Sequence, residues 1–225
     1  MIEHITTAIE HRTELIHTLH QEETDCYRLF HGATEGIPGL SIDRYGSILL
    51  MQTWREALGE DQANQIADHI CTQLGISLSP VWNHRQKRGR VEHHVLRDII
   101  NSPVGKELGV EYDVSPVHDG IDPLLFLDFR SARRWIRTVS QNKTVLNLFS
   151  YTCGMGVVAC LGQAKQVLNI DFSMRSLQIG EENARRNNIP LKPENSSSQF
   201  SCIKDDVFPV IRQFSGLGIK GNQTY

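Results

Sequence analysis

The stretch of residues 145–173, VLNLFSYTCGMGVVACLGQAKQVLNIDFS, constrains the fold of this chain more than any other. Residues 145–149 form a short apolar run suited to a buried parallel strand, and residues 166–170 form a second one. A helix of small residues begins between them at Gly154. The second run ends in Asp171, where an acidic side chain can hold the ribose hydroxyls of a nucleoside. The pattern therefore predicts a βαβ unit that binds a nucleoside-containing cofactor.

The residues that follow continue this alternation of strand and helix. Ser173 can cap a helix that runs to about Asn187, because its hydroxyl can accept a hydrogen bond from an otherwise unsatisfied amide. Residues 200–204 resemble a third strand, which ends in two acidic residues and precedes a helix over residues 208–214. We therefore expect residues 116–225 to form the first half of a Rossmann-like α/β domain with a parallel sheet.

A small α+β domain is expected ahead of this unit, over residues 27–115. Glycine and proline punctuate alternating runs at residues 40–43 and 48–53, which is typical of strands joined in a hairpin. Apolar residues recur on one helical face over residues 57–74, and residues 81–83 predict a strand that returns beside the hairpin. We expect the sheet of this domain to be antiparallel.

The first 26 residues predict one amphipathic helix that carries four histidines, His4, His11, His17 and His20. Histidines at helical spacing suggest a metal site, but no set of acidic or cysteine ligands accompanies them. We therefore favour a solvated helical face and expect no bound metal.

Composition narrows the class of protein and of partner. The net charge of −3 provides no global basic field for nucleic acid, so any such contact must be local. Five widely spaced cysteines without a CxxC pair favour neither zinc nor a disulfide framework. No apolar run approaches the roughly 20 residues that cross a bilayer. These features predict a cytoplasmic protein that does not enter a membrane.

Residues 83–94, NHRQKRGRVEHH, are the best candidate for contact with phosphate groups. A solvated surface loop is the alternative, because basic runs are most often simply hydrated. The candidate contact residues are Arg85, Lys87, Arg88 and Arg90.

Two classes of cofactor compete for the turn before Gly154. A dinucleotide site favours the pattern GxGxxG, since the pyrophosphate must approach backbone amides at the start of the helix. This chain has Ala159 in place of the third glycine and a long turn, SYTCGMG. The pattern is looser than that of an NAD site and fits S-adenosylmethionine, whose methionine end carries no phosphate.

Three segments, FLDFRSARRWI, the stretch of residues 145–173 and KDDVF, together resemble the class I methyltransferases that modify bacterial large-subunit ribosomal RNA. The nearest patterns are those of the 5-methylcytosine and 7-methylguanine enzymes. The segment EGIPGLSIDRYG also resembles the small domain of the 5-methylcytosine branch. The resemblance covers about residues 27–215 and implies a Rossmann-like methyltransferase domain preceded by a small α+β domain.

The resemblance also implies which residues contact S-adenosylmethionine. The methionine end lies against the turn, the ribose against the end of the second strand, the adenine near the end of the third strand, and a preceding segment closes the pocket. The residues against the methionine end are Phe149, Ser150, Tyr151, Thr152 and Gly154. Asp171 contacts the ribose and Asp206 lies near the adenine. The residues of the preceding segment are Phe126, Asp128 and Arg130, and Phe172 and Val207 are further contacts. Cys153 and Cys160 are expected to be packing residues and not nucleophiles.

The family receives its target base on an Asp-Pro-Pro loop after the fourth strand, and this segment is absent before Tyr225. No catalytic residue is therefore assigned. We expect the chain alone to be inactive and to self-associate through the exposed edge of the strand at residues 145–149. The leading hypothesis is a methyltransferase of ribosomal RNA. A catalytically silent module for RNA binding or assembly and an NAD-dependent oxidoreductase stay open as alternatives.

Overall fold

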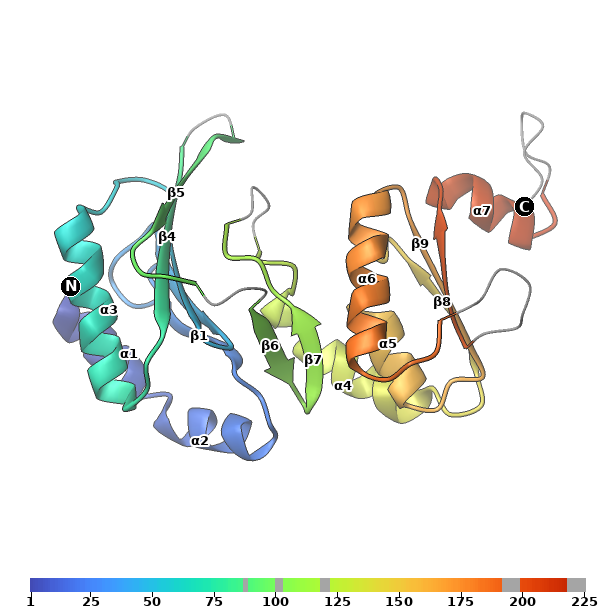
Figure 1. The fold of residues 1–225 in the computed structure, drawn as a ribbon, viewed down its shortest axis with the longest axis horizontal. Coiled ribbons are helices and arrows are strands. Elements are labelled where there is room, and N and C mark those ends of the chain that lie inside the picture. The colour runs from blue at the N-terminus through green and yellow to red at the C-terminus, as the bar shows by residue number, and fades with distance from the viewer. Residues whose placement is uncertain (87–88, 100–102, 118–121, 192–198, 218–225) are drawn as a thin grey trace. The chain divides into compact units, whose positions relative to one another are not determined.

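The computed structural model describes residues 1–86, 89–99, 103–117, 122–191 and 199–217 of the chain. They form two compact units, Met1–Leu127 and Asp128–Tyr225. Each unit is built around its own sheet (Figure 1). None of the helices within the described ranges is long and apolar enough to cross a membrane.

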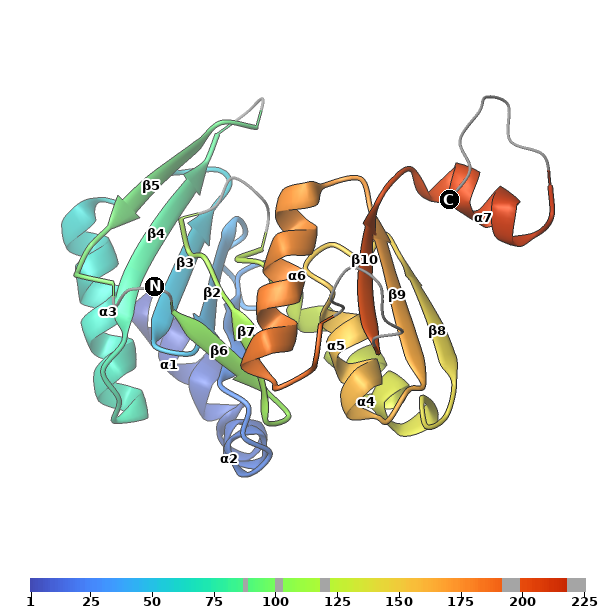
Figure 2. The ribbon, with the colours of Figure 1, turned by 45° about the vertical axis from the view of Figure 1, so that its right-hand side comes forward.

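A five-stranded sheet forms the centre of the first unit. Its strands follow one another in space in the order of the sequence: β1 (Cys26–His31), β2 (Leu40–Tyr45), β3 (Ile48–Thr53), β4 (Ser79–Arg85) and β5 (Val91–Val95). Neighbouring strands are antiparallel except β3 and β4, which are parallel. The prediction of an antiparallel sheet was therefore wrong at this pair. Helix α3 (Glu60–Leu74) carries the chain back along the sheet, so β4 starts at the same end as β3 (Figure 2).

The core of the first unit lies between this sheet and two helices, α1 (Ile2–Glu10) and α3. Apolar side chains of both helices, such as Ile9 and Ile66, pack in one cluster with Leu49 and Met51 of β3. The strands β6 (Val104–Glu107) and β7 (Val110–Asp113) form a separate antiparallel pair in the same unit.

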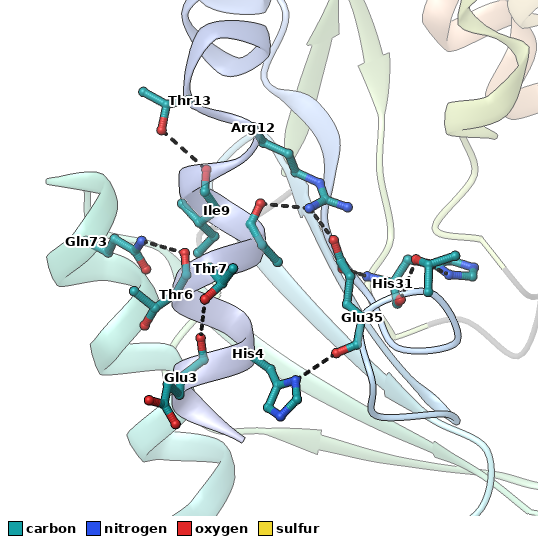
Figure 3. Close-up of polar contacts among 12 residues, drawn as sticks. Glu3, His4, Thr6, Thr7, Ile9, Arg12, Thr13, His31, Glu35 and Gln73 are labelled. Atoms are coloured by element: carbon teal, nitrogen blue, oxygen red, sulfur yellow. Dashed lines mark hydrogen bonds and ion pairs between the residues drawn. The ribbon is translucent and has the colours of Figure 1, made fainter.

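The chain begins with two short helices, α1 and α2 (Thr13–Gln21), so the prediction of one continuous helix was wrong. The break lies at Arg12. There the carbonyl of Ala8 accepts a hydrogen bond from the Arg12 guanidinium, at 2.7 Å, and not from the Arg12 amide as in a continuous helix. The same guanidinium forms an ion pair with Glu35 (Figure 3). Glu35 in turn accepts a hydrogen bond from the His31 amide at 2.6 Å, which ties the helix break to the loop after β1.

Two of the four N-terminal histidines take part in tertiary contacts, which corrects the prediction of a purely solvated face. His4 Nδ1 lies 3.0 Å from the carbonyl oxygen of Glu35 (Figure 3), and His20 Nε2 lies 2.9 Å from the hydroxyl of Tyr27. Within the described ranges, no group of three histidine, cysteine or acidic side chains is placed to hold a metal ion.

The second unit contains a parallel three-stranded sheet in the order β10-β9-β8 (Figure 2). Its elements are η2 (Leu127–Phe129), which begins at the last residue of the first unit, α4 (Arg130–Val139), β8 (Thr144–Leu148), α5 (Gly154–Leu161), β9 (Gln166–Asp171), α6 (Met174–Arg186), β10 (Phe200–Lys204) and α7 (Val207–Phe214). This order confirms the predicted α/β alternation. Ser173 caps α6 as expected, because its hydroxyl accepts from the Ser176 amide at 3.2 Å.

Helices α5 and α6 cover one face of the parallel sheet, and α4 packs against α5. On the other face, Val207 and Val210 of α7 pack against Ile170 at the end of β9. Strand β8 pairs only with β9 in the part of the chain that the structure describes. Its Leu146 side chain is exposed.

Candidate cofactor site

The turn that follows β8 is held in one conformation by hydrogen bonds within the turn and to β9. The Ser150 amide donates to the carbonyl of Ile170 at 3.0 Å, and the Cys153 amide donates to the carbonyl of Ser150 at 2.7 Å. Phe149, Tyr151 and Cys153 have positive φ angles of 52°, 49° and 58°. Such angles are uncommon for residues other than glycine and persist only where the surroundings enforce them. The turn is therefore preorganised.

Asp171 connects this turn to the start of α6. Its Oδ2 accepts from the Tyr151 amide and its Oδ1 from the Ser173 amide, each at 2.9 Å. The residue is 5% exposed. A carboxylate has about four acceptor sites, so these two bonds leave lone pairs that can accept hydrogen bonds from the hydroxyls of a ribose. Sequence reasoning assigned Asp171 to the ligand but missed that it also shapes the turn.

Helix α6 supports the turn from the side of the core. The buried amide of Asn183 donates to the carbonyl of Thr152 at 3.1 Å. Gly180 allows the close approach, because a Cβ atom there would lie 2.3 Å from the sulfur of Cys153 and 2.7 Å from its Cβ. Sequence reasoning missed both residues, although a glycine inside a helix is a signal of close packing.

The cysteines near the turn are packing residues, as predicted. Cys153 is fully buried, with its sulfur 3.9 Å from that of Cys202. Contact with the Cys202 thiol and burial raise the pKa of Cys153 well above its usual value. Burial raises the pKa of Cys160 to about 12. Neither sulfur is a thiolate at neutral pH, so neither is an activated nucleophile.

Most of the predicted cofactor residues lie where the three parallel strands end. Gly154 begins α5, and Phe149 is 59% exposed, with its ring meeting that of Phe208 edge-on at 6.2 Å. Asp206 caps α7 by accepting from the Phe208 amide at 3.0 Å. The turn residues together with Asp171, Phe172, Asp206 and Val207 thus gather at the carboxyl edge of the sheet.

The three residues of the preceding segment have different places in the structure. Asp128 is exposed in η2, and Arg130 is the first residue of α4. Phe126 is exposed and belongs to the first unit. Their part in closing a pocket therefore stays a prediction.

The predicted RNA-contact residues lie around the connection from β4 to β5. Arg85 is half-buried at the end of β4, and its Nε donates to Oε1 of Gln52 at 2.7 Å. Arg90 is exposed just before β5. Lys87 and Arg88 lie outside the described residues.

Known proteins share both the sequence pattern and the fold. The chain is 32% identical to the ribosomal RNA large subunit methyltransferase I of Shigella flexneri, over 87% of this chain and 49% of that protein. A candidate S-adenosylmethionine-dependent methyltransferase from Streptococcus mutans has a TM-score of 0.76 at 23% identity, over 96% of this chain and 54% of that one. A candidate methyltransferase solved with S-adenosylhomocysteine has a TM-score of 0.77 at 23% identity, over 96% and 53% of the two chains. The chain spans about half the length of the curated relatives it matches.

A family profile matches part of each unit. The profile, described as S-adenosylmethionine-dependent methyltransferase, matches residues 27–193. The matched range contains β8, the turn after it, α5 and β9. The glycine pattern left two classes of cofactor open. The match decides between them, since this family uses S-adenosylmethionine and not NAD. The chain therefore belongs to the S-adenosylmethionine-dependent methyltransferase family.

Proposed function

We propose that this chain carries the cofactor site of a methyltransferase that acts on a base of RNA, with ribosomal RNA as the acceptor. The observation that carries the proposal is the position of Asp171, which ends β9 and accepts two backbone hydrogen bonds beside the turn. The name of the Shigella flexneri relative supports ribosomal RNA as the substrate.

In this proposal, Phe149, Ser150, Tyr151, Thr152 and Gly154 surround the methionine end of S-adenosylmethionine. Asp171 accepts hydrogen bonds from the ribose, next to Phe172, and Asp206 with Val207 lies near the adenine. Phe126, Asp128 and Arg130 close the pocket. The sulfonium of the cofactor supplies an already activated methyl group, so the protein contributes mainly by holding donor and acceptor in line.

The turn has physical properties that suit this task. Its conformation is enforced by hydrogen bonds from Ser150 and Cys153 and by the packing of α6, so little ordering is left for the moment of binding. The amino end of α5 carries a partial positive charge, which favours a carboxylate such as that of methionine.

We assign residues 27–115 to a small α+β domain that contacts RNA, residues 116–225 to the cofactor domain and residues 1–26 to an N-terminal helical segment. Arg85, Lys87, Arg88 and Arg90 are the proposed RNA contacts. The exposed edge of β8 is the proposed surface for self-association, because it is apolar and, among the described strands, pairs only with β9. The cytoplasm is the proposed location.

Calorimetry on the 225-residue chain tests the cofactor site. We expect saturable binding of S-adenosylmethionine and S-adenosylhomocysteine. Replacing Asp171 by alanine removes an acceptor for both the turn and the ribose. Since hydrogen bonds to charged groups contribute about 1.5–3 kcal/mol each, we expect roughly a 10- to 100-fold weaker affinity for S-adenosylhomocysteine.

The matched control is Asp61→Ala, which changes an exposed carboxylate in the first turn of α3 and should leave affinity unchanged. Thermal melting of Asp171→Ala checks that the variant is folded. Equal affinity in the parent chain and Asp171→Ala, or binding of NAD alone, contradicts the proposal.

A further inference from the structure

The first unit contains an open hollow of about 530 Å³ at the carboxyl ends of β3 and β4. These two strands are parallel, so the segments that follow them emerge at the same end of the sheet (Figure 2). In open α/β sheets, ligands bind in crevices outside the carboxyl ends of parallel strands, and β3 and β4 are the one parallel pair among the described strands of this sheet. The lining residues are Trp54, Arg55, Glu56, His84, Arg85 and Gln86.

Trp54 presents its indole at this hollow while its backbone is fixed. The side chain is 42% exposed, although tryptophan is usually well buried. Its amide donates to the carbonyl of Gly39 at 2.9 Å, which holds the segment directly after β3. Gly39 also lies beneath the stem of Arg55, because a Cβ atom there would come within 3.0 Å of the Arg55 Cγ. The aromatic face and the neighbouring cation are therefore presented together.

The opposite wall is also held in place. His84 pairs with Thr53 across the parallel strands, and its Nδ1 lies 2.9 Å from the Thr53 hydroxyl. That hydroxyl also accepts from the indole nitrogen of Trp82 at 3.0 Å. The guanidinium of Arg85 is positioned through Nε by Gln52, at 2.7 Å. A buried network thus fixes an imidazole and a guanidinium at the rim.

An exposed aromatic face and two arginines that line one hollow have the chemistry of a site for single-stranded nucleic acid. Unpaired bases stack on exposed aromatic side chains, and guanidinium groups bind the phosphates on either side. One glutamate, Glu56, lines the hollow against two arginines, so the charged groups are mainly cationic.

We propose that this hollow binds an unpaired nucleotide of RNA, with its base stacked on Trp54 and the adjoining phosphates contacted by Arg55 and Arg85. The proposal rests on RNA as the substrate of the proposed function and specifies how it is held. It adds Trp54, Arg55 and His84 to Arg85 among the proposed RNA contacts. It also predicts a preference for single-stranded over duplex RNA, because a paired base cannot leave its stack without cost.

Fluorescence anisotropy with a short labelled oligouridine and the full chain tests this site. Trp54→Ala should weaken binding roughly 10-fold, the typical effect of losing one base stack. Trp54→Phe should restore most of the affinity, because phenylalanine keeps an aromatic face. The matched control is Trp135→Ala, which removes the 62% exposed tryptophan of α4 and should not change affinity. A duplex of the same length should bind more weakly than the single strand.

Unchanged affinity in Trp54→Ala, an equal loss in Trp135→Ala, or equal binding of duplex RNA overturns the proposal. Competition by polyglutamate as strong as that by RNA also overturns it, since the site would then recognise an acidic peptide. The assay contains no S-adenosylmethionine. A chain that binds RNA through Trp54 but not S-adenosylhomocysteine would refute the proposed function and leave this site intact.

Discussion

The two units place their candidate sites at the same kind of position and build them differently. In the second unit, the edge formed by β8 and β9 is closed by a turn of strained residues and by a carboxylate that is 5% exposed. In the first unit, the edge formed by β3 and β4 is an open hollow with a 42% exposed tryptophan. A closed, preorganised edge suits a small cofactor of fixed shape. An open edge with separate aromatic and cationic groups suits a polymer that must enter and leave.

The closed edge depends on close packing of α6 against the turn. Gly180→Ala should disrupt this packing and have the largest expected effect on stability and cofactor affinity. Alanine is the better helix former by about 1 kcal/mol, so local propensity predicts stabilisation. The contact of 2.3 Å between the new Cβ and the Cys153 sulfur predicts the reverse. We expect a net loss of about 1–3 kcal/mol in unfolding free energy, measured in urea, and more than roughly 10-fold weaker binding of S-adenosylhomocysteine.

Gly59→Ala is the matched control, because a Cβ at this residue before α3 meets nothing within 4 Å. A Gly180→Ala variant more stable than the parent chain would show that the turn is not held by α6.

At the open edge, Arg55→Ala removes a positive charge. We expect its effect on RNA affinity to be smaller than the effect of Gly180→Ala on cofactor affinity. Removing one phosphate contact lowers the slope of log Kd against log salt by about 0.7 for single-stranded nucleic acid. We expect the affinity for oligouridine to fall several-fold at low salt and to converge with that of the parent chain at high salt. The measurement is a salt titration by fluorescence anisotropy.

Arg97→Ala provides the comparison for this variant. Arg97 is also a cation of the first unit, but it forms an ion pair with Asp68, so its loss should change the salt slope less. If the two variants have the same slope, Arg55 does not contact a phosphate.

The effect that is smallest at neutral pH, and that grows only in alkali, concerns the packing behind the closed edge. Burial raises the pKa of the Cys160 thiol from 9.0 to about 12, so the folded state favours the protonated form. This contribution to stability is fully present below pH 9 and is lost as the pH rises toward 12. The melting temperature should therefore fall over this range. It should fall less steeply in Cys160→Ala than in the parent chain, whereas Cys71→Ala, a half-buried cysteine of α3, should keep the parent slope.

The elements around the closed edge could be predicted from the sequence because their signals are local. Short apolar runs placed the strands β8, β9 and β10, and Ser173 placed the start of α6. The same local signals misled at the N-terminus, where an apolar period continued across Arg12. There the helix is interrupted at Arg12, whose guanidinium donates to Ala8 and pairs with Glu35, and helical periodicity carries no information about either partner.

The sequence by itself determined the alternation of strands and helices and the acidic residue that ends β9. Tertiary structure alone decided that Gly180 and Asn183 support the turn and that β3 runs parallel to β4. It also decided that Trp54 lies with His84 and Arg85, about thirty residues further along the chain, in one hollow. The physical reason is that strand and helix periods arise from neighbouring residues, whereas a site is made by side chains that only the packing of distant segments brings together.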